Sequence, residues 1–295
     1  MVASFDQRLF PFERNYFDRG DGVRMHYVDE GQGPPVVCVH GNPTWSFYYR
    51  NVVTALMADH RVIAPDHVGM GLSDKPGGDR YGYTLKDRVD DFENFINFMD
   101  LTKPLALVVH DWGGMIALAW AVRHPSRVAK LVILNTAAFP LPEDKKFPWA
   151  LALTRTPVGS LLVRGLNAFS WTATRVAMTH NAMPAEVRRA YTAPYDSWAN
   201  RIATLRFVQD IPLRLGAPGF DIIQETAANL HKLAAVPMLI GWGGRDFVFD
   251  DAFLRVWQRN FPTAEVLYFA DAGHYVLEDA ALELIPRIAA FIRND

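Results

Sequence analysis

The chain has 295 residues, half of them hydrophobic and about a fifth charged, so it can bury a large core and is not intrinsically disordered. Its net charge of -2 includes no basic excess that would favour nucleic acid and no acidic tail. The length fits two domains, or one α/β domain that carries an insertion.

The single cysteine excludes an intrachain disulfide. Cys38 lies in the apolar run 36–39, which predicts a buried and inert thiol. Residues 1–19 carry charges and lack an apolar stretch, and no run approaches the ~18 apolar residues that a transmembrane helix needs. We therefore expect no signal peptide, no transmembrane segment and a cytoplasmic protein.

The first predicted elements in chain order are strands. Residues 16–18 and 23–28 flank Gly20–Asp21–Gly22, a pattern typical of two strands joined by a turn. Short apolar runs follow, as buried parallel strands show, and a helix is predicted over 114–123. The runs cover 36–39, 61–65, 105–109, 128–134, 236–240 and 266–269. Because they alternate with helical segments, we predict an α/β fold with a mostly parallel sheet covered on both faces.

The alternation stops between residues 139 and 215, where helical spacing, prolines and aromatic side chains predict a helical cap inserted after the strand that ends near Leu134. This segment has ten Lys and Arg against five Asp and Glu, a net charge of +5 against -7 for the remainder. It is either a solvated basic face or a surface that docks to an acidic partner. We expect a core domain of residues 1–138 and 216–295 and a cap domain of residues 139–215.

Residues 108–114, Val-Val-His-Asp-Trp-Gly-Gly, carry the strongest chemical signal. They predict a strand, a sharp turn and a helix, with Asp111 at the bend, and resemble the nucleophile elbow of α/β hydrolases. Gly113 and Gly114 would let strand and helix approach, whereas Val109 stands where the serine motif has glycine. On its own, Asp111 fits a helix N-cap equally well.

Two further side chains follow predicted strands. Asp246 comes after the run 236–240 and a glycine-rich turn, and His274 comes after the run 266–269. An α/β-hydrolase triad has the chain order nucleophile, acid, histidine, and sites form where strands end at one edge of a parallel sheet. We therefore expect Asp111, Asp246 and His274 to meet as nucleophile, acid and base. Asp250 and Asp251 are interpreted as a helix start.

The loop at residues 39–45, Val-His-Gly-Asn-Pro-Thr-Trp, follows the first central strand. In such folds this loop supplies an oxyanion-hole N–H beside the N–H that follows the nucleophile. Those amides would belong to Asn42 and Trp112, whose side chains add an amide and an indole donor. Converging donors of this kind suit a leaving anion or carboxylate.

An aspartate at position 111 sets the reaction type. A carboxylate is ionised at neutral pH and can displace a leaving group at saturated carbon without a base, which gives an ester with the enzyme. His274, held by Asp246, would then activate water against that ester. Serine-type esterases and peptidases are therefore disfavoured.

The stretches HGNPTW at 40–45 and HDWGG at 110–114 resemble the haloalkane dehalogenase branch of the α/β hydrolases, and the resemblance covers nearly the whole chain. It implies Asp111 as nucleophile, His274 as base and Asn42 with Trp112 as the halide-holding pair. Some members place the acid as a glutamate after the strand that ends here at Leu134, where this chain reads Asn-Thr. The resemblance therefore implies Asp246 as the acid. We expect no cofactor and no metal.

Within that branch, residues 42–50 and 246–250 are similar to the β-lactone decarboxylases of bacterial long-chain olefin biosynthesis. These enzymes open a cis-3,4-dialkyl-oxetan-2-one and release carbon dioxide and a cis-alkene. The similarity implies a small hydrophobic substrate, attack by Asp111 on one of two ring carbons, and partner enzymes of the same pathway. An aromatic cap suits two alkyl chains, since burial of each CH₂ is worth ~0.8 kcal/mol.

Three other hypotheses about the function stay open. A haloalkane dehalogenase would use the same residues with water. An epoxide hydrolase needs two cap tyrosines, for which Tyr191 and Tyr195 are candidates, although Asn42 stands where those enzymes have a bulky apolar residue. A ligand-binding relic of a hydrolase is disfavoured by the intact nucleophile, acid and base. The oligomeric state stays open.

Overall fold

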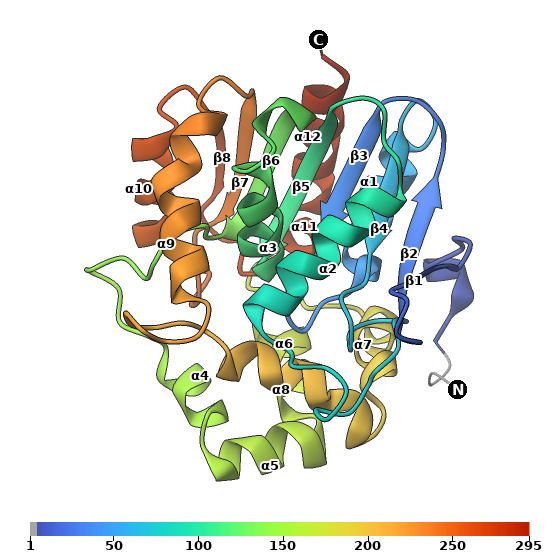
Figure 1. The fold of residues 1–295 in the computed structure, drawn as a ribbon, viewed down its shortest axis with the longest axis vertical. Helices are drawn as coiled ribbons and strands as arrows, with labels where there is room; N and C mark the ends of the chain where they lie inside the picture. The colour runs from blue at the N-terminus through green and yellow to red at the C-terminus, as the bar shows by residue number, and fades with distance from the viewer. Residues whose placement is uncertain (1–4, 295) are drawn as a thin grey trace.

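The computed structural model describes residues 5–294; the first four residues of the N-terminal segment considered above, and Asp295, lie outside this range. Its centre is an eight-stranded sheet with the strand order β1-β2-β4-β3-β5-β6-β7-β8 (Figure 1). β2 runs antiparallel to β1 and to β4, and all other neighbours are parallel. The strands are β1 (Asn15–Asp18), β2 (Arg24–Glu30), β3 (Pro35–Val39), β4 (Arg61–Pro65), β5 (Leu105–Asp111), β6 (Val128–Thr136), β7 (Met238–Gly243) and β8 (Glu265–Phe269).

Helices cover both faces of the sheet, because the central strands are apolar on both sides. One apolar cluster joins the sheet to α2, α3, α9 and α10, and a second joins it to α1, α11 and α12. These helices are α1 (Arg50–Leu56), α2 (Leu85–Phe98), α3 (Trp112–Ala121), α9 (Phe220–Asn229), α10 (Asp251–Asn260), α11 (Val276–Asp279) and α12 (Ala281–Arg293). The predicted α/β architecture is confirmed, and Cys38 is buried within it.

The segment between β6 and α9 contains short helices that lie across the end of the sheet where β5 meets α3 (Figure 1). They are α4 (Trp149–Thr154), α5 (Pro157–Leu166), α6 (Ala168–Val176), α7 (Ala185–Thr192) and α8 (Ile202–Gln209). The helical character predicted for this segment is confirmed. Among residues 5–294, no helix combines the length and the apolar character needed to cross a membrane.

Several predicted boundaries are wrong. The helix predicted over 114–123 spans Trp112–Ala121, so it begins directly after Asp111. Gly241 and Gly243 were expected in a turn after a strand over 236–240, but both lie in β7, paired with Leu267 and Phe269 of β8. A Cβ at Gly243 would overlap the carbonyl of Gly273, and a Cβ at Gly241 would press on the methyl groups of Leu134 and Leu284, so these glycines serve close packing rather than a turn. The longer strand carries the chain as far as the loop that holds Asp246.

Candidate active site

Asp111 occupies a sharp bend between β5 and α3. Its φ of +51° lies in the left-handed region, which is strained for a non-glycine residue and typical of functional sites. A Cβ at Gly113 would overlap the carbonyl of Val39, and a Cβ at Gly41 would overlap the Asp111 carboxylate. The bend is therefore possible only because both positions are glycine. Asp111 is the N-cap residue of α3, but its side chain makes no capping hydrogen bond there.

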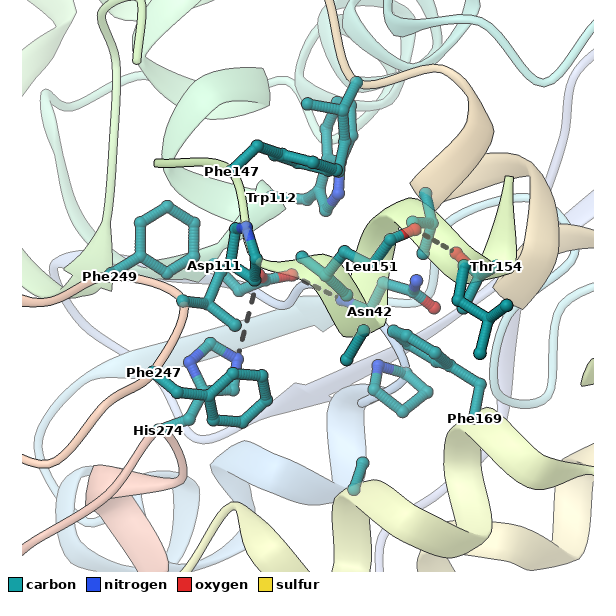
Figure 2. Close-up of a pocket in the computed structure, with 18 of the residues that line it drawn as sticks. Asn42, Asp111, Trp112, Phe147, Leu151, Thr154, Phe169, Phe247, Phe249 and His274 are labelled. Atoms are coloured by element: carbon teal, nitrogen blue, oxygen red, sulfur yellow. Dashed lines mark hydrogen bonds and ion pairs between the residues drawn. The ribbon is translucent and has the colours of Figure 1, made fainter. Parts of the chain in front are cut away.

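The three residues expected to form a triad do lie together, each after a different strand. His274 Nδ1 lies 2.7 Å from Asp246 Oδ2. His274 Nε2 lies 3.7 Å from Asp111 Oδ2, as Figure 2 shows. All three side chains are buried. The imidazole therefore has one nitrogen fixed by a carboxylate and the other directed at Asp111. Asp250, by contrast, caps α10, as expected for a helix start.

The environment raises the pKa of both groups that face each other, the Asp111 carboxyl and the His274 imidazole. Burial raises the pKa of Asp111 above its ordinary value, although the charge of His274 and hydrogen bonds from the backbone of Asn42 and Trp112 lower it. Burial alone lowers the pKa of His274, but the charge and hydrogen bond of Asp246, together with the charge of Asp111, raise it above its ordinary value. The imidazolium form is thus stabilised next to an ionised Asp111.

The hydrogen-bond donors at the elbow divide into backbone donors and side-chain donors, and the sequence alone did not show which of them contact Asp111. The backbone N–H of Asn42 donates to Asp111 Oδ1 at 2.6 Å (Figure 2). This amide therefore holds the carboxylate itself. The Asn42 side-chain Nδ2 donates to the carbonyl of Thr204 in α8 at 3.0 Å, which leaves its second N–H. The Asn42 and Trp112 side chains both line the adjoining cavity.

Beside Asp111 lies a cavity of about 450 Å³ between the sheet and the helices α4, α5, α6 and α8 (Figure 2). Of the described residues that line it, only Asp111 and His274 are ionisable. Most others are apolar, and the aromatic ones besides Trp112 are Phe139, Phe147, Trp149, Phe169, Phe247, Phe249 and Phe253. Such a cavity takes an uncharged, largely hydrocarbon molecule and presents it to one carboxylate.

Two buried residues behind the site were missed by the sequence analysis. His110 Nε2 donates to the carbonyl of His274 at 2.8 Å, and the two rings pack with centroids 4.6 Å apart. The guanidinium of Arg88 lies 5.2 Å from the ring centre of Trp112 and 3.7 Å from that of Phe207. His110 is adjacent to the elbow motif, which was a usable signal. Nothing in the sequence around Arg88 indicated its position.

Asn135, which follows the strand where other branch members place the acid, has a structural role. Its side chain donates to the carbonyl of Gly243 and accepts from the N–H of Gly243, so it joins β6 to β7. The neighbouring Thr136 hydroxyl donates to the carbonyl of Asp111. Position 135 therefore presents no acid to His274, and Asp246 alone contacts Nδ1.

Tyr191 and Tyr195 do not reach the cavity. The Tyr191 hydroxyl donates to Glu278, which also pairs with Arg50, and the Tyr195 hydroxyl lies near the carbonyl of Thr44. Neither residue lines the cavity. The pair of tyrosine acids that an epoxide hydrolase needs is therefore not formed by these two residues.

Comparison with known proteins agrees with this geometry. A family model described as alpha/beta hydrolase fold matches residues 34–281. A cis-3-alkyl-4-alkyloxetan-2-one decarboxylase from Shewanella oneidensis is 53% identical over 96% of this chain and 89% of the relative. Haloalkane dehalogenase 2 from Mycobacterium bovis is 32% identical over 97% of this chain and 96% of the relative. A haloalkane dehalogenase structure from Agrobacterium tumefaciens superposes with a TM-score of 0.86 at 24% identity, covering 97% and 98% of the two chains, and this likeness shows the fold.

Proposed function

Since the chain belongs to the α/β-hydrolase fold family, we propose that it is a β-lactone decarboxylase, which converts a cis-3-alkyl-4-alkyloxetan-2-one into a cis-alkene and carbon dioxide. The observation that carries the proposal is an ionisable aspartate at the elbow, facing an apolar cavity, in a chain 53% identical to a decarboxylase of that name. A dehalogenase relative is more distant, at 32% identity. The chemistry follows from the geometry of Asp111 and its partners.

The first step is attack by Asp111 Oδ2 on the saturated ring carbon that carries the ring oxygen. A new C–O bond forms, the ring C–O bond breaks, and its electron pair stays on the departing oxygen as a free carboxylate. Attack at the ring carbonyl is disfavoured because the backbone amide of Asn42 already donates to Asp111 Oδ1 and is not free for a carbonyl oxygen. The side-chain donors of Asn42 and Trp112 face the new carboxylate.

The second step returns the enzyme to its starting state. The bond between the substrate carboxylate and its chain carbon breaks, and the electron pair forms the alkene and expels Asp111 as a carboxylate. Carbon dioxide and alkene leave, and no water is consumed. The Asn42 amide on Oδ1 and the His274 imidazolium, 3.7 Å from Oδ2, stabilise the charge that returns to Asp111. Asp246 keeps that imidazole oriented and protonated.

The second candidate is a haloalkane dehalogenase, favoured by the donor pair of Asn42 and Trp112 at the elbow. In that reaction, Asp111 displaces a halide, and His274 in its neutral form activates water against the resulting ester. The two candidates therefore share a nucleophile and differ in whether the ester breaks by elimination or by hydrolysis.

A direct assay separates the candidates. Purified protein is incubated with a cis-dialkyl β-lactone and, separately, with 1-bromobutane, and alkene and bromide are measured. We expect alkene without appreciable bromide, because the chain is 53% identical to a relative named as this decarboxylase and only 32% identical to a haloalkane dehalogenase. Rapid bromide release with an inert lactone would establish the dehalogenase instead.

The pH dependence of kcat/KM gives a second test. Asp111 must be ionised, so activity is lost on acidification at a higher pH than for an exposed aspartate, because its pKa is raised. In the decarboxylase His274 acts as imidazolium, so activity also falls as pH rises through its raised pKa. A hydrolase would instead keep its activity on the alkaline side. As a control, Asp246→Asn lowers the pKa of His274, and we expect the alkaline limb to move to lower pH.

The proposal also covers the domain boundaries, the kind of substrate, the partner enzymes and the location of the protein. A core of residues 1–138 and 216–295 under a cap of residues 139–215 accounts for a cavity between sheet and short helices. A small hydrophobic substrate fits that cavity. Partner enzymes of an olefin pathway, one of which makes the lactone, and a cytoplasmic location belong to the same proposal.

A further inference from the structure

α5 turns apolar side chains outward. Val158, Leu161 and Leu166 are 63%, 60% and 73% exposed. Val158 and Leu161 lie three residues apart and share one side of the helix, and Leu166 is its last residue. The helix buries Gly159 and Val163 instead. A surface helix ordinarily presents charged or polar residues to water. The three exposed side chains of α5 therefore form an unpartnered apolar surface.

Two neighbouring helices, α4 and α6, add exposed apolar side chains to those of α5. α4 and α6 pack against α5, and they contribute Trp149, 79% exposed, and Trp171, 53% exposed. We call Trp149, Val158, Leu161, Leu166 and Trp171 the apolar cap face. Figure 1 shows α4 and α5 at the edge of the molecule that lies away from the sheet. Trp149, Val158, Leu161 and Leu166 thus belong to two adjoining helices at this edge, and Trp171 belongs to α6, which packs against α5.

The charged side chains within the segment that carries the apolar cap face have a single sign. No Asp or Glu occurs from residue 145 to residue 185. Arg155, Arg164 and Arg175 lie within this stretch, and none forms an ion pair with a carboxylate among residues 5–294. The Arg175 guanidinium lies 3.5 Å from the ring centre of Trp171. Tryptophan and arginine around an apolar surface suit a boundary between hydrocarbon and anionic headgroups.

The same helices form one wall of the active-site cavity. Trp149 lines the cavity as well as lying on the apolar cap face, and Leu153, Leu162 and Val176 line it from α4, α5 and α6. Only the thickness of these helices separates the outer face from the catalytic cavity. A molecule with two alkyl chains partitions into lipid, so a route through this wall would avoid water.

We propose that the apolar cap face docks on a phospholipid bilayer that contains anionic lipid. The indole and aliphatic side chains enter the acyl boundary, and the three arginines lie at the headgroups. Docking brings the cavity wall to the lipid, from which the alkyl substrate enters and to which the alkene leaves. The substrate route rests on the proposed function, whereas the docking rests on the apolar cap face alone.

The test is flotation of the full chain with vesicles of phosphatidylcholine and phosphatidylglycerol. The double variant Leu161→Glu/Leu166→Glu is compared with wild type and with Leu282→Glu, a control at a residue of α12 that is 94% exposed. Wild type and control are expected to float. The double variant is expected to lose vesicle binding about tenfold or more. Binding of wild type is expected to weaken on pure phosphatidylcholine and at high salt.

The outcomes separate docking from catalysis. Leu161 and Leu166 do not line the cavity, so the double variant is expected to turn over a short-chain, water-soluble lactone at the wild-type rate. The docking proposal is overturned if wild type does not float or if the double variant floats equally well. It is also overturned if the substitutions instead dissociate a dimer of this chain that binds no vesicles. Flotation without lactone turnover would contradict the proposed function and leave docking supported.

Discussion

Replacing Asp111 with alanine is expected to abolish alkene formation from a cis-dialkyl β-lactone, with a loss of about 10⁴-fold or more in kcat. The reason is that Asp111 is the only carboxylate among the described residues that line the cavity. His274 and Asp246 cannot replace it, because His274 acts on the Asp111 carboxylate and Asp246 acts by orienting His274. Rates are measured by gas chromatography of the alkene, with wild type as the reference.

The same variant is expected to remain folded. Burial raises the pKa of Asp111, so the fold disfavours the ionised form, and removing that carboxylate relieves an unfavourable buried charge. We expect Asp111→Ala to unfold at the wild-type temperature or above, as measured by circular dichroism. Retained activity in a folded variant would refute Asp111 as the nucleophile. A lower melting temperature would show that the carboxylate stabilises the elbow.

Replacing His274 with alanine is expected to slow turnover by about 10²- to 10⁴-fold and to trap an ester on Asp111. Without the imidazolium, 3.7 Å from Oδ2, the charge that returns to Asp111 in the second step is less stabilised. Attack itself needs no base, so the ester accumulates. Rapid quenching and mass spectrometry of the peptide that contains Asp111 detect the adduct.

The mass of that adduct identifies the reaction. Opening of a lactone adds the mass of the whole lactone, because no atom has left, whereas displacement of a halide adds only the alkyl group. The double variant Asp111→Ala/His274→Ala serves as the control and is expected to form no adduct. Slow turnover with no adduct, or an adduct on another residue, would contradict the covalent route.

The sequence predicts the site well where chemistry and backbone geometry are encoded in consecutive residues. HDWGG specifies the elbow because the glycines are needed for the close approach at Gly113. The strand–loop pattern places Asp246 and His274 because parallel strands end at one edge of the sheet. The strand over Arg61–Pro65 is predicted to the residue for the same reason, since a short apolar run has clear ends.

Features that depend on contacts between distant segments were not predictable. The distinction between backbone and side-chain donors at Asn42 arises from how β3 and β5 lie together, which fixes the amide 2.6 Å from Asp111 Oδ1. Arg88 reaches Trp112 from α2, and Glu278 joins Arg50 to Tyr191 across three elements. The extent of β7 was misjudged because Gly241 and Gly243 ordinarily indicate turns and here permit close packing.

The hold of the Asn42 main-chain amide on Asp111 Oδ1 has an evolutionary consequence. When Asp111 is alkylated on Oδ2, Oδ1 becomes the carbonyl oxygen of the ester and takes the position that the substrate's carbonyl oxygen takes when a serine is acylated. With a serine at position 111, the N–H groups of Asn42 and Trp112 would be vacant and directed at an incoming acyl group. Alkyl transfer and acyl transfer are therefore separated in this scaffold by the length of one side chain, and an ancestor could have passed from one to the other without rebuilding the loop.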